Sequence, residues 1–419
     1  MNIRIKVPSS RDYLFYLYLL FVFFLPFTKV SVPIVGLYEF TFADLLIVFL
    51  FLVNVLFIKN IKDYFGVYIY SFIIFVSGVF ASIVMVKDYF AFTMGVLPYA
   101  FATLVIISTL SFFSNGDHLK QFRYIRNTVY ISLLFSTVPV YYQIVTGVKL
   151  DAFYDVYGWR YTFLAQNPNQ FGVYMILFFF ILTIINLKYF KKSLSTVFYL
   201  ELIYIPVALF SGSRTATVIF AVNLLVVAFI LFITTTTLRR MIIAPIVVGA
   251  LLLSVPSALK LISQSGGQVN RALRVFDLLS SSDEVIADDT PSGHSMAEAK
   301  SLFLSYPIFG VGLANKPMYS EVRTEIHNTY LKFLAETGFV GFCGFLLIFT
   351  LPLLLTLFSN SSYLVKLTLI LFYIMFAAMN WPHMLLRQRW VWFFMVIIFI
   401  IGRIDKNGKP DRSKLQLLN

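Results

Sequence analysis

The stretch RTATVIFAVNLLVVAFILFIT, residues 214–234, decides the class of fold. It carries one charged side chain, Arg214, at its first position, and its length matches the ~20 residues that an α-helix needs to cross a bilayer. An apolar run of this length is typical of a membrane-spanning helix and not of a helix on the surface of a soluble domain.

The rest of the chain has the same character. Hydrophobic residues make up 59% of its 419 residues and charged residues 13%, whereas soluble domains carry about 25% charged residues. Its apolar runs are too long for the roughly ten-residue strands of a membrane β-barrel. We therefore expect an all-α polytopic membrane protein with about twelve spanning helices. The predicted spans are residues 13–30, 39–58, 64–86, 89–113, 123–146, 168–187, 194–210, 214–234, 241–262, 339–358, 364–381 and 389–403.

Basic residues lie in alternate loops between the predicted spans and in the C-terminal tail. By the positive-inside rule these loops are cytoplasmic, and an even number of spans places both termini on that side. The remaining loops then lie on the outer side, and only one of them is long enough to hold structure of its own. The chain is expected to have four parts: spanning helices one to nine in residues 1–262, an outer loop with short helices in 263–338, helices ten to twelve in 339–403, and a cytoplasmic tail in 404–419.

The composition also limits the kinds of partner and ligand that we expect. The net charge of +13 does not indicate nucleic-acid binding, because the basic residues fall between spans, where they suit membrane orientation and anionic lipids. The single cysteine, Cys343, lies in an apolar run, and the four histidines are scattered. The sequence therefore predicts no disulfide framework, no metal site and no cofactor.

The segment SGSRTA, residues 211–216, is the first candidate for chemistry. Arg214 stands at the beginning of a predicted helix, where unpaired amides and the helix dipole favour an anion, and a guanidinium can hold two oxygens of a diphosphate. Ser211 and Ser213 flank a glycine that lets a ligand approach the backbone. The alternative is that Arg214 only reaches lipid headgroups.

The segment IHNTYLKFLAETGFVG, residues 326–341, is the second candidate. An imidazole ordinarily titrates near neutral pH, so His327 at the membrane surface could serve as a general base. The alternative is an ordinary interfacial histidine. Asn328 is expected to cap the following helix, while Gly338 and Gly341 are expected to end one helix and let the next pack closely.

A third segment, YPIFGVGL at residues 306–313, is expected to end the helix MAEAKSLFLS that precedes it. Together with NPNQFG at residues 167–172, these three segments resemble the superfamily of O-antigen ligases and O-antigen or capsule polymerases. The resemblance covers a large central part of the chain, and the many-span frame is similar beyond it.

The resemblance implies an inner-membrane glycosyltransferase that works on the periplasmic face without metal and takes its glycan from undecaprenyl diphosphate. It implies that His327 acts on the acceptor hydroxyl and that Arg214 holds the donor diphosphate. Attack opposite the leaving group would invert the anomeric centre. The implied partners are the lipid-linked donor, a glycan or lipid A-core acceptor, membrane lipids and a chain-length regulator.

One position departs from the family pattern, because SGHS places His294 where the family commonly has an arginine. The second diphosphate contact is therefore open. Its main candidates are Arg160, Arg271, Arg274 and His294, followed by Arg323, Arg387 and Arg389. Supporting roles are expected for Ser211, Ser213, Asn328, Tyr330 and Glu336.

The sequence leaves the reaction itself open. A polymerase is preferred over a ligase, because the Phe-, Ile- and Lys-rich composition is typical of AT-rich surface-polysaccharide gene clusters and the outer loop is of modest size. A lipid-linked sugar flippase is the alternative outside the enzymes, because Asp44 and Glu201 lie within predicted spans, although neither has a basic partner there. An interfacial belt is expected from a group of aromatic residues, with sugar stacking as a second interpretation. The group comprises Tyr141, Tyr142, Phe153, Tyr154, Tyr157, Trp159 and Tyr161.

Overall fold

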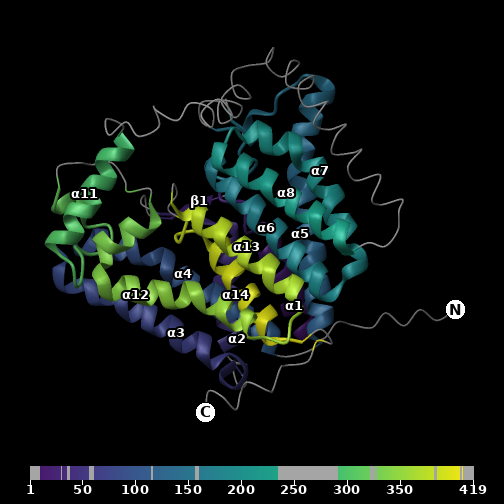
Figure 1. Ribbon diagram of the computed structural model, residues 1–419. Helices are drawn as coiled ribbons and strands as arrows, with labels where there is room; N and C mark the ends of the chain where they lie inside the picture. Colours follow the sequence, from purple (N-terminus) through teal and green to yellow (C-terminus); the bar gives the residue numbers. More distant parts are fainter. Residues whose placement is uncertain are drawn as a thin grey trace. The chain divides into compact units, whose positions relative to one another are not determined.

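The computed structural model describes twelve helices and one hairpin (Figure 1). It describes residues 10–29, 31–34, 38–55, 61–114, 117–155, 160–234, 291–320, 326, 328–381, 385–405 and 408. The helices are α1 Ser10–Phe24, α2 Phe42–Val55, α3 Ile61–Ala81, α4 Tyr89–Ser114, α5 His118–Thr146, α6 Pro168–Tyr189, α7 Leu194–Ser211, α8 Arg214–Thr234, α11 Pro291–Ser305, α12 Thr329–Leu357, α13 Tyr363–Asn380 and α14 Arg389–Arg403. Short 3-10 turns are η1 Ser82–Met85, η2 Asp151–Phe153, η3 Lys191–Ser193 and η4 Lys316–Met318.

The described helices confirm a polytopic membrane protein. Eight of them, α3 to α8, α12 and α13, are long and apolar enough to cross a bilayer, while α1 and α2 contain shorter apolar helices and α14 has 15 residues. The predicted span at residues 241–262 lies outside the described residues, so the total of twelve stays a prediction.

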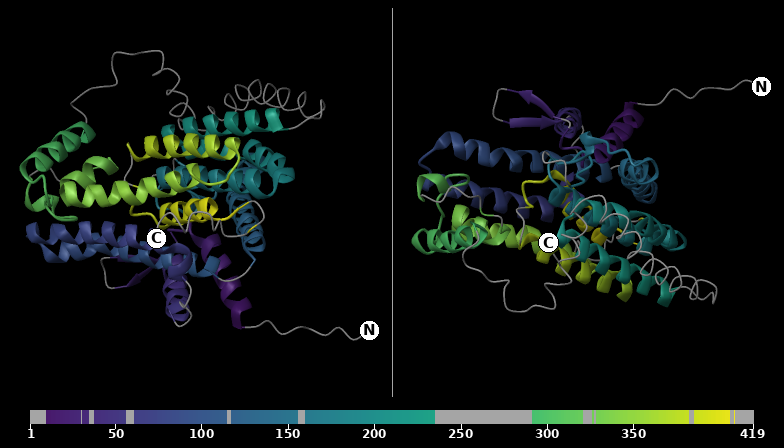
Figure 2. Two further views of the ribbon diagram at one scale, coloured as in Figure 1. Left: turned by 60° about the horizontal axis from the view of Figure 1, so that its bottom comes forward. Right: turned by 90° about the horizontal axis from the view of Figure 1, so that it is seen from above.

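One local feature differs from the expectation. The second predicted span begins with strand β2, Tyr38–Thr41, which pairs antiparallel with β1, Ser31–Ile34, as the two arrows in Figure 2 show. Helix α2 begins only after this strand, because Thr41 is the N-terminal cap of the helix. The Thr41 hydroxyl accepts from the Asp44 amide at 3.2 Å, and the Thr41 amide donates to the Asp44 carboxylate at 2.8 Å. This reciprocal pair is a capping box.

The chain divides into two compact units, which we describe separately. The first unit comprises residues 1–132, 295–361 and 384–419, and the second comprises 133–294 and 362–383.

In the first unit, α12 packs against α3 and α14, and α14 packs against α4. Glycines permit the closest of these contacts: a Cβ on Gly341 would lie 3.3 Å from the Gly78 carbonyl oxygen of α3, and one on Gly344 would lie 2.8 Å from the Phe75 Cα. Every residue from Arg389 to Gly402 is buried, and Trp392 of α14 lies edge-on to Phe72 of α3. An apolar run without a polar face is what a helix at the centre of a packed unit requires.

In the second unit, α6 packs against α7, α8 and α13. Its residues 171–187 are all buried, and Phe180 stacks on Phe372 of α13 with ring centroids 4.0 Å apart. Helix α6 starts where the sequence indicates, because the Asn167 side chain accepts from the Gln170 amide and Pro168 occupies the first turn.

Candidate functional site

The SGSR turn, residues 211–214, joins α7 to α8 in the second unit. Helix α7 ends at Ser211, Gly212 takes the left-handed conformation at φ 58°, and α8 begins at Arg214. The Ser211 hydroxyl donates to the Ala208 carbonyl at 2.7 Å and accepts from the Ser213 amide at 3.3 Å. The backbone prediction for this segment is confirmed, and the side chain of Arg214 lies outside the described part of the chain.

The start of α8 offers more than its own amides. The first amides of a helix have no partner within the helix, so they can bind an anion. The Ser213 hydroxyl is buried beside them, and among the described residues its oxygen has no hydrogen-bond partner. The Ser213 hydroxyl can therefore donate a hydrogen bond to an anion at a helix start that already favours negative charge.

Arg160 lies across this same turn. Its Nε donates to the Ser211 carbonyl at 3.1 Å and its Nη2 donates to the Asn169 side-chain oxygen at 2.9 Å. A Cβ on Gly212 would lie 3.3 Å from the Arg160 Nε, so glycine leaves room for the guanidinium. These two hydrogen bonds fix the cation beside the start of α8.

The NPNQFG segment completes the arrangement. Gly172, in the first turns of α6, would bring a Cβ within 2.3 Å of the Ala216 Cβ and 3.6 Å of the Ser213 hydroxyl. Because only a glycine tolerates that approach, the starts of α6 and α8 lie in direct contact. The stretch around Arg160 and the NPNQFG segment that soon follows it therefore meet the more distant SGSRTA segment at one place.

Two of the aromatic residues expected in the interfacial belt, Tyr154 and Tyr161, are instead packed inside the protein, whereas Tyr142 is 44% exposed. Tyr154 is 3% exposed and Tyr161 is fully buried, with their ring centroids 5.6 Å apart. Burial raises the pKa of Tyr161 well above its usual value, so the phenol keeps its proton and donates to the Ser136 carbonyl at 2.5 Å. Neither ring is available for stacking on a sugar.

In the first unit, the second motif forms a broken helix. Gly338 interrupts α12 with φ 63° and ψ −165°, which separates a first arm, residues 329–337, from the apolar arm that follows. Asn328 caps the first arm, because its side-chain oxygen accepts from the Leu331 amide at 3.0 Å. The predicted cap and the predicted helix end at Gly338 are both confirmed.

The YPIFGVGL segment binds to this break. The amides of Val311 and Gly312 donate to the carbonyls of Ala335 and Glu336 at 2.9 Å each. In return, the Phe339 amide donates to the Pro307 carbonyl at 2.7 Å. These bonds satisfy backbone groups that the break would leave unpaired.

Two glycines allow this contact. A Cβ on Gly310 would lie 2.5 Å from the Glu336 carbonyl carbon, and one on Gly338 would lie 2.3 Å from the Ile308 carbonyl oxygen. The two motifs are therefore one structural element, which neither motif alone could indicate.

Buried charges surround this element. Lys332 lies 3.9 Å from Glu336 on the first arm, and Lys316 lies 2.5 Å from Glu298 of α11. Tyr330 is half-buried, with its ring 6.1 Å from that of Phe345. Of these residues, Tyr330 and Glu336 were expected near the site, whereas the lysines were missed.

Asn315 is another residue that the sequence analysis missed. Its side-chain oxygen accepts from the Asp88 amide at 2.7 Å, and its amide nitrogen donates to the Asp88 carbonyl at 3.1 Å. It therefore fastens the segment after YPIFGVGL to the start of α4. No local pattern in the sequence indicates this contact.

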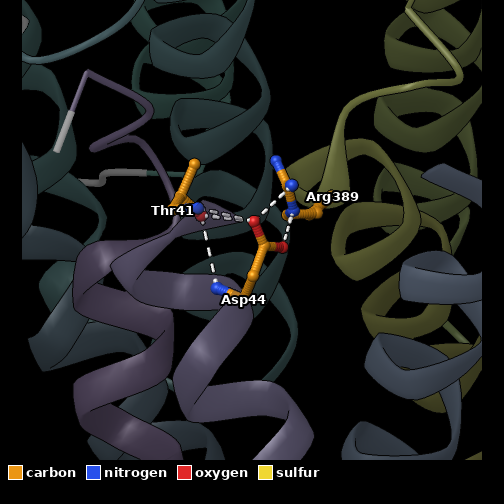
Figure 3. Close-up of polar contacts among 3 residues, drawn as sticks. All are labelled: Thr41, Asp44 and Arg389. Atoms are coloured by element: carbon orange, nitrogen blue, oxygen red, sulfur yellow. Dashed lines mark hydrogen bonds and ion pairs between the residues drawn. The ribbon is translucent and has the colours of Figure 1, made fainter. Parts of the chain in front are cut away.

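The expectation that Asp44 lacks a basic partner is wrong. Asp44 forms a buried ion pair with Arg389, as Figure 3 shows, and Thr41 donates to the same carboxylate. The Arg389 guanidinium also lies 5.4 Å from the ring centre of Phe101. Arg389 is thereby removed from the candidates for diphosphate binding, since its charge is matched inside the fold.

Glu201 has a different partner. The Asn223 side chain donates to its carboxyl oxygen at 2.6 Å, joining α7 to α8. Both side chains are fully buried.

Several predicted site residues lie outside the described residues: His327, Arg271, Arg274 and Arg323. His294 lies in the first turns of α11, because this helix begins at Pro291, earlier than the predicted helix, and the His294 side chain is not described. Across the described ranges, no three His, Cys, Asp or Glu side chains are grouped as a metal site would require.

Comparison with known families identifies the region that contains both motifs. Residues 199–346 match the family model for O-antigen ligase. The matched region begins in α7, includes the SGSR turn and ends in α12 beyond Gly338, which confirms the resemblance drawn from the motifs. A search of curated proteins found no match to the chain.

Proposed function

We propose that this chain, which has the O-antigen ligase signature over residues 199–346, is a glycosyltransferase that takes its glycan from undecaprenyl diphosphate at the periplasmic face of the inner membrane. The family match carries the proposal. It is supported by a cationic, amide-rich helix start at the SGSR turn and by the capped first arm of α12.

The donor diphosphate is proposed to bind at the start of α8. Arg214 begins this helix, and Arg160 is held across the preceding turn by hydrogen bonds to the Ser211 carbonyl and the Asn169 side chain. Arg160 is favoured over Arg271, Arg274 and His294 as the second contact, because its guanidinium is fixed at that turn. The leaving diphosphate gains negative charge as the glycosidic bond breaks, so fixed guanidinium groups stabilise the transition state more than the ground state.

The acceptor hydroxyl is proposed to lose its proton to His327. This residue precedes the cap of α12, where Asn328 and the YPIFGVGL segment fix the backbone that follows. A positioned general base contributes roughly 10²–10⁴-fold to such a step. The hydroxyl attacks opposite the diphosphate, which gives inversion, and no metal is assigned a role.

Polymerisation of lipid-linked repeat units is our first candidate activity. Ligation of the finished polymer to lipid A core is the second, and the description of the matching family favours it. A flippase is disfavoured, because the Arg389 guanidinium matches the charge of Asp44. Of the two carboxyls that the sequence analysis placed within spans, Glu201 alone then remains for a proton relay.

A deletion strain distinguishes the three. Without a polymerase, lipid A core should carry one repeat unit and no ladder. Without a ligase, the core should be bare and long polymer should accumulate on the lipid carrier. Without a flippase, single lipid-linked units should remain on the cytoplasmic side. We expect the first pattern on a gel of surface polysaccharide, restored by the plasmid-borne chain.

A further inference from the structure

Among the described residues, helix α11 packs against the rest of the first unit through one face. Its buried residues Ala299 and Leu302 pack in a cluster with Val311, Ile326 and Ala335. The opposite face is exposed, and it changes character along the helix: Ala297, Lys300 and Ser301 come first, and Leu304 follows with 69% of its surface exposed.

The exposed apolar surface continues into the YPIFGVGL segment. Ile308, one turn beyond Leu304, is 58% exposed. Its carbonyl accepts from the Val340 amide at 3.2 Å, so its backbone lies beside the beginning of the apolar arm of α12.

The apolar arm of α12 indicates that this surface faces lipid. The part of α12 after Gly338 belongs to a helix apolar enough to span the bilayer. Exposed side chains form a row along one side of this arm. They belong to Phe339, Cys343, Leu346, Leu347 and Leu354. A spanning helix with such a row exposes it to acyl chains.

Phe339, 60% exposed, is the first residue of this row, and its amide bonds to the Pro307 carbonyl. Because the predicted span begins at Phe339, the loop that carries Ile308 is expected at the depth where that span leaves the hydrocarbon.

We propose that the last turn of α11 and the segment that follows it lie in the membrane–water interface on the periplasmic side of the inner membrane. The side chains of Leu304 and Ile308 would then lie among the acyl chains. Lys300, one turn earlier, then lies at headgroup depth, where a lysine suits anionic lipid. Ala297 is in water, so the helix enters the interface with its C-terminal end. A lipid surface accounts for these residues better than a protein partner, because the row they adjoin already faces lipid.

Nitroxide labels on the full-length chain in vesicles of phosphatidylethanolamine and phosphatidylglycerol test this depth. Ala297→Cys, Leu304→Cys and Ile308→Cys are made in a Cys343→Ala background, and each label's collisions with oxygen and with a water-soluble nickel chelate are compared. The native Cys343 provides the lipid-facing reference.

Oxygen collisions should dominate at Leu304 and Ile308, and nickel collisions should dominate at Ala297. Nickel access at all three positions would overturn the proposal in favour of an aqueous face. Low access to both reagents at Leu304 and Ile308 would overturn it in favour of a covering protein. No substrate is needed, so the result does not depend on the proposed reaction.

Discussion

The carboxylate of Asp44 and the guanidinium of Arg389 form a buried ion pair between the first turns of α2 and α14 (Figure 3). The turn before Arg389 is also attached to α12, because the Leu385 amide donates to the Thr329 hydroxyl at 3.2 Å. The starts of three helices are thereby fixed together, including the helix that follows His327.

Removal of one member of this pair should be costly. Asp44→Ala leaves a buried guanidinium without its counter-charge, which costs about 3–5 kcal/mol, and the thermal midpoint in detergent should fall strongly. The double variant Asp44→Ala, Arg389→Ala should lose much less than the sum of the single losses.

The exposed pair Lys149–Asp151 is the control, because Asp151 is 87% exposed and Asp151→Ala should cost under about 1 kcal/mol. Additive losses in the double variant would show that the Asp44–Arg389 pair contributes no coupling.

Gly338→Ala should destabilise the first unit. The position has a positive φ, and its Cβ would lie 2.5 Å from the Gly310 amide nitrogen. Gly147→Ala is the matched control, since its φ is 71° but nothing lies within 4 Å. The control should cost about 1–2 kcal/mol, and Gly338→Ala clearly more. Equal shifts in the heat-denaturation midpoint would mean that the contact with YPIFGVGL is loose.

Arg160→Lys and Arg214→Lys should each reduce glycan transfer. An ammonium keeps the charge but loses the planar pair of donors, and charge-assisted bonds worth about 1.5–3 kcal/mol correspond to a roughly 10–100-fold loss. The measurement is transfer from lipid-linked donor by purified protein, with the amount of folded protein as a second readout.

Arg126→Lys, at the predicted cytoplasmic end of α5, is the control and should retain transfer. Full transfer by Arg214→Lys would reduce Arg214 to a headgroup anchor. Loss of folded protein in Arg160→Lys would assign Arg160 a structural role alone.

His327→Ala should reduce glycan transfer by roughly 10²–10⁴-fold while the protein stays inserted and abundant. His118→Ala, at the start of α5 on the predicted cytoplasmic side, should transfer normally. A near-normal polysaccharide ladder from His327→Ala would remove the general-base assignment.

Contacts within the first unit also constrain the topology. Asn315 binds the backbone of Asp88, so both lie on one face of the membrane. Five helices that can each span, α4 to α8, separate Asp88 from Thr234. If each of these helices spans, Thr234 and Ser305 are expected on opposite faces, as the predicted span at 241–262 requires.

Cysteine labelling in the full-length Cys343→Ala chain tests this. A membrane-impermeant maleimide added from outside should label Ser305→Cys, and it should label Thr234→Cys only after permeabilisation. Labelling of both without permeabilisation would contradict the topology.

Local rules explain what the sequence determined by itself. Run length and hydropathy placed α4, α8 and α14 within a residue of their observed bounds, because a span needs only its own residues to satisfy its backbone in lipid. The Asn328 cap and the break at Gly338 also follow from neighbours in the chain. The motifs and their order also indicated the family whose model matches residues 199–346.

Only the tertiary structure decided which distant groups meet. Asp44 and Arg389 are 345 positions apart, and nothing near either residue indicates the other. The burial of Tyr161 and the position of Arg160 against Gly212 likewise depend on how helices and loops pack. A charge or a ring near a span end satisfies the local pattern equally well in lipid, in water or in a core. The choice among these depends on partners that packing brings from elsewhere in the chain.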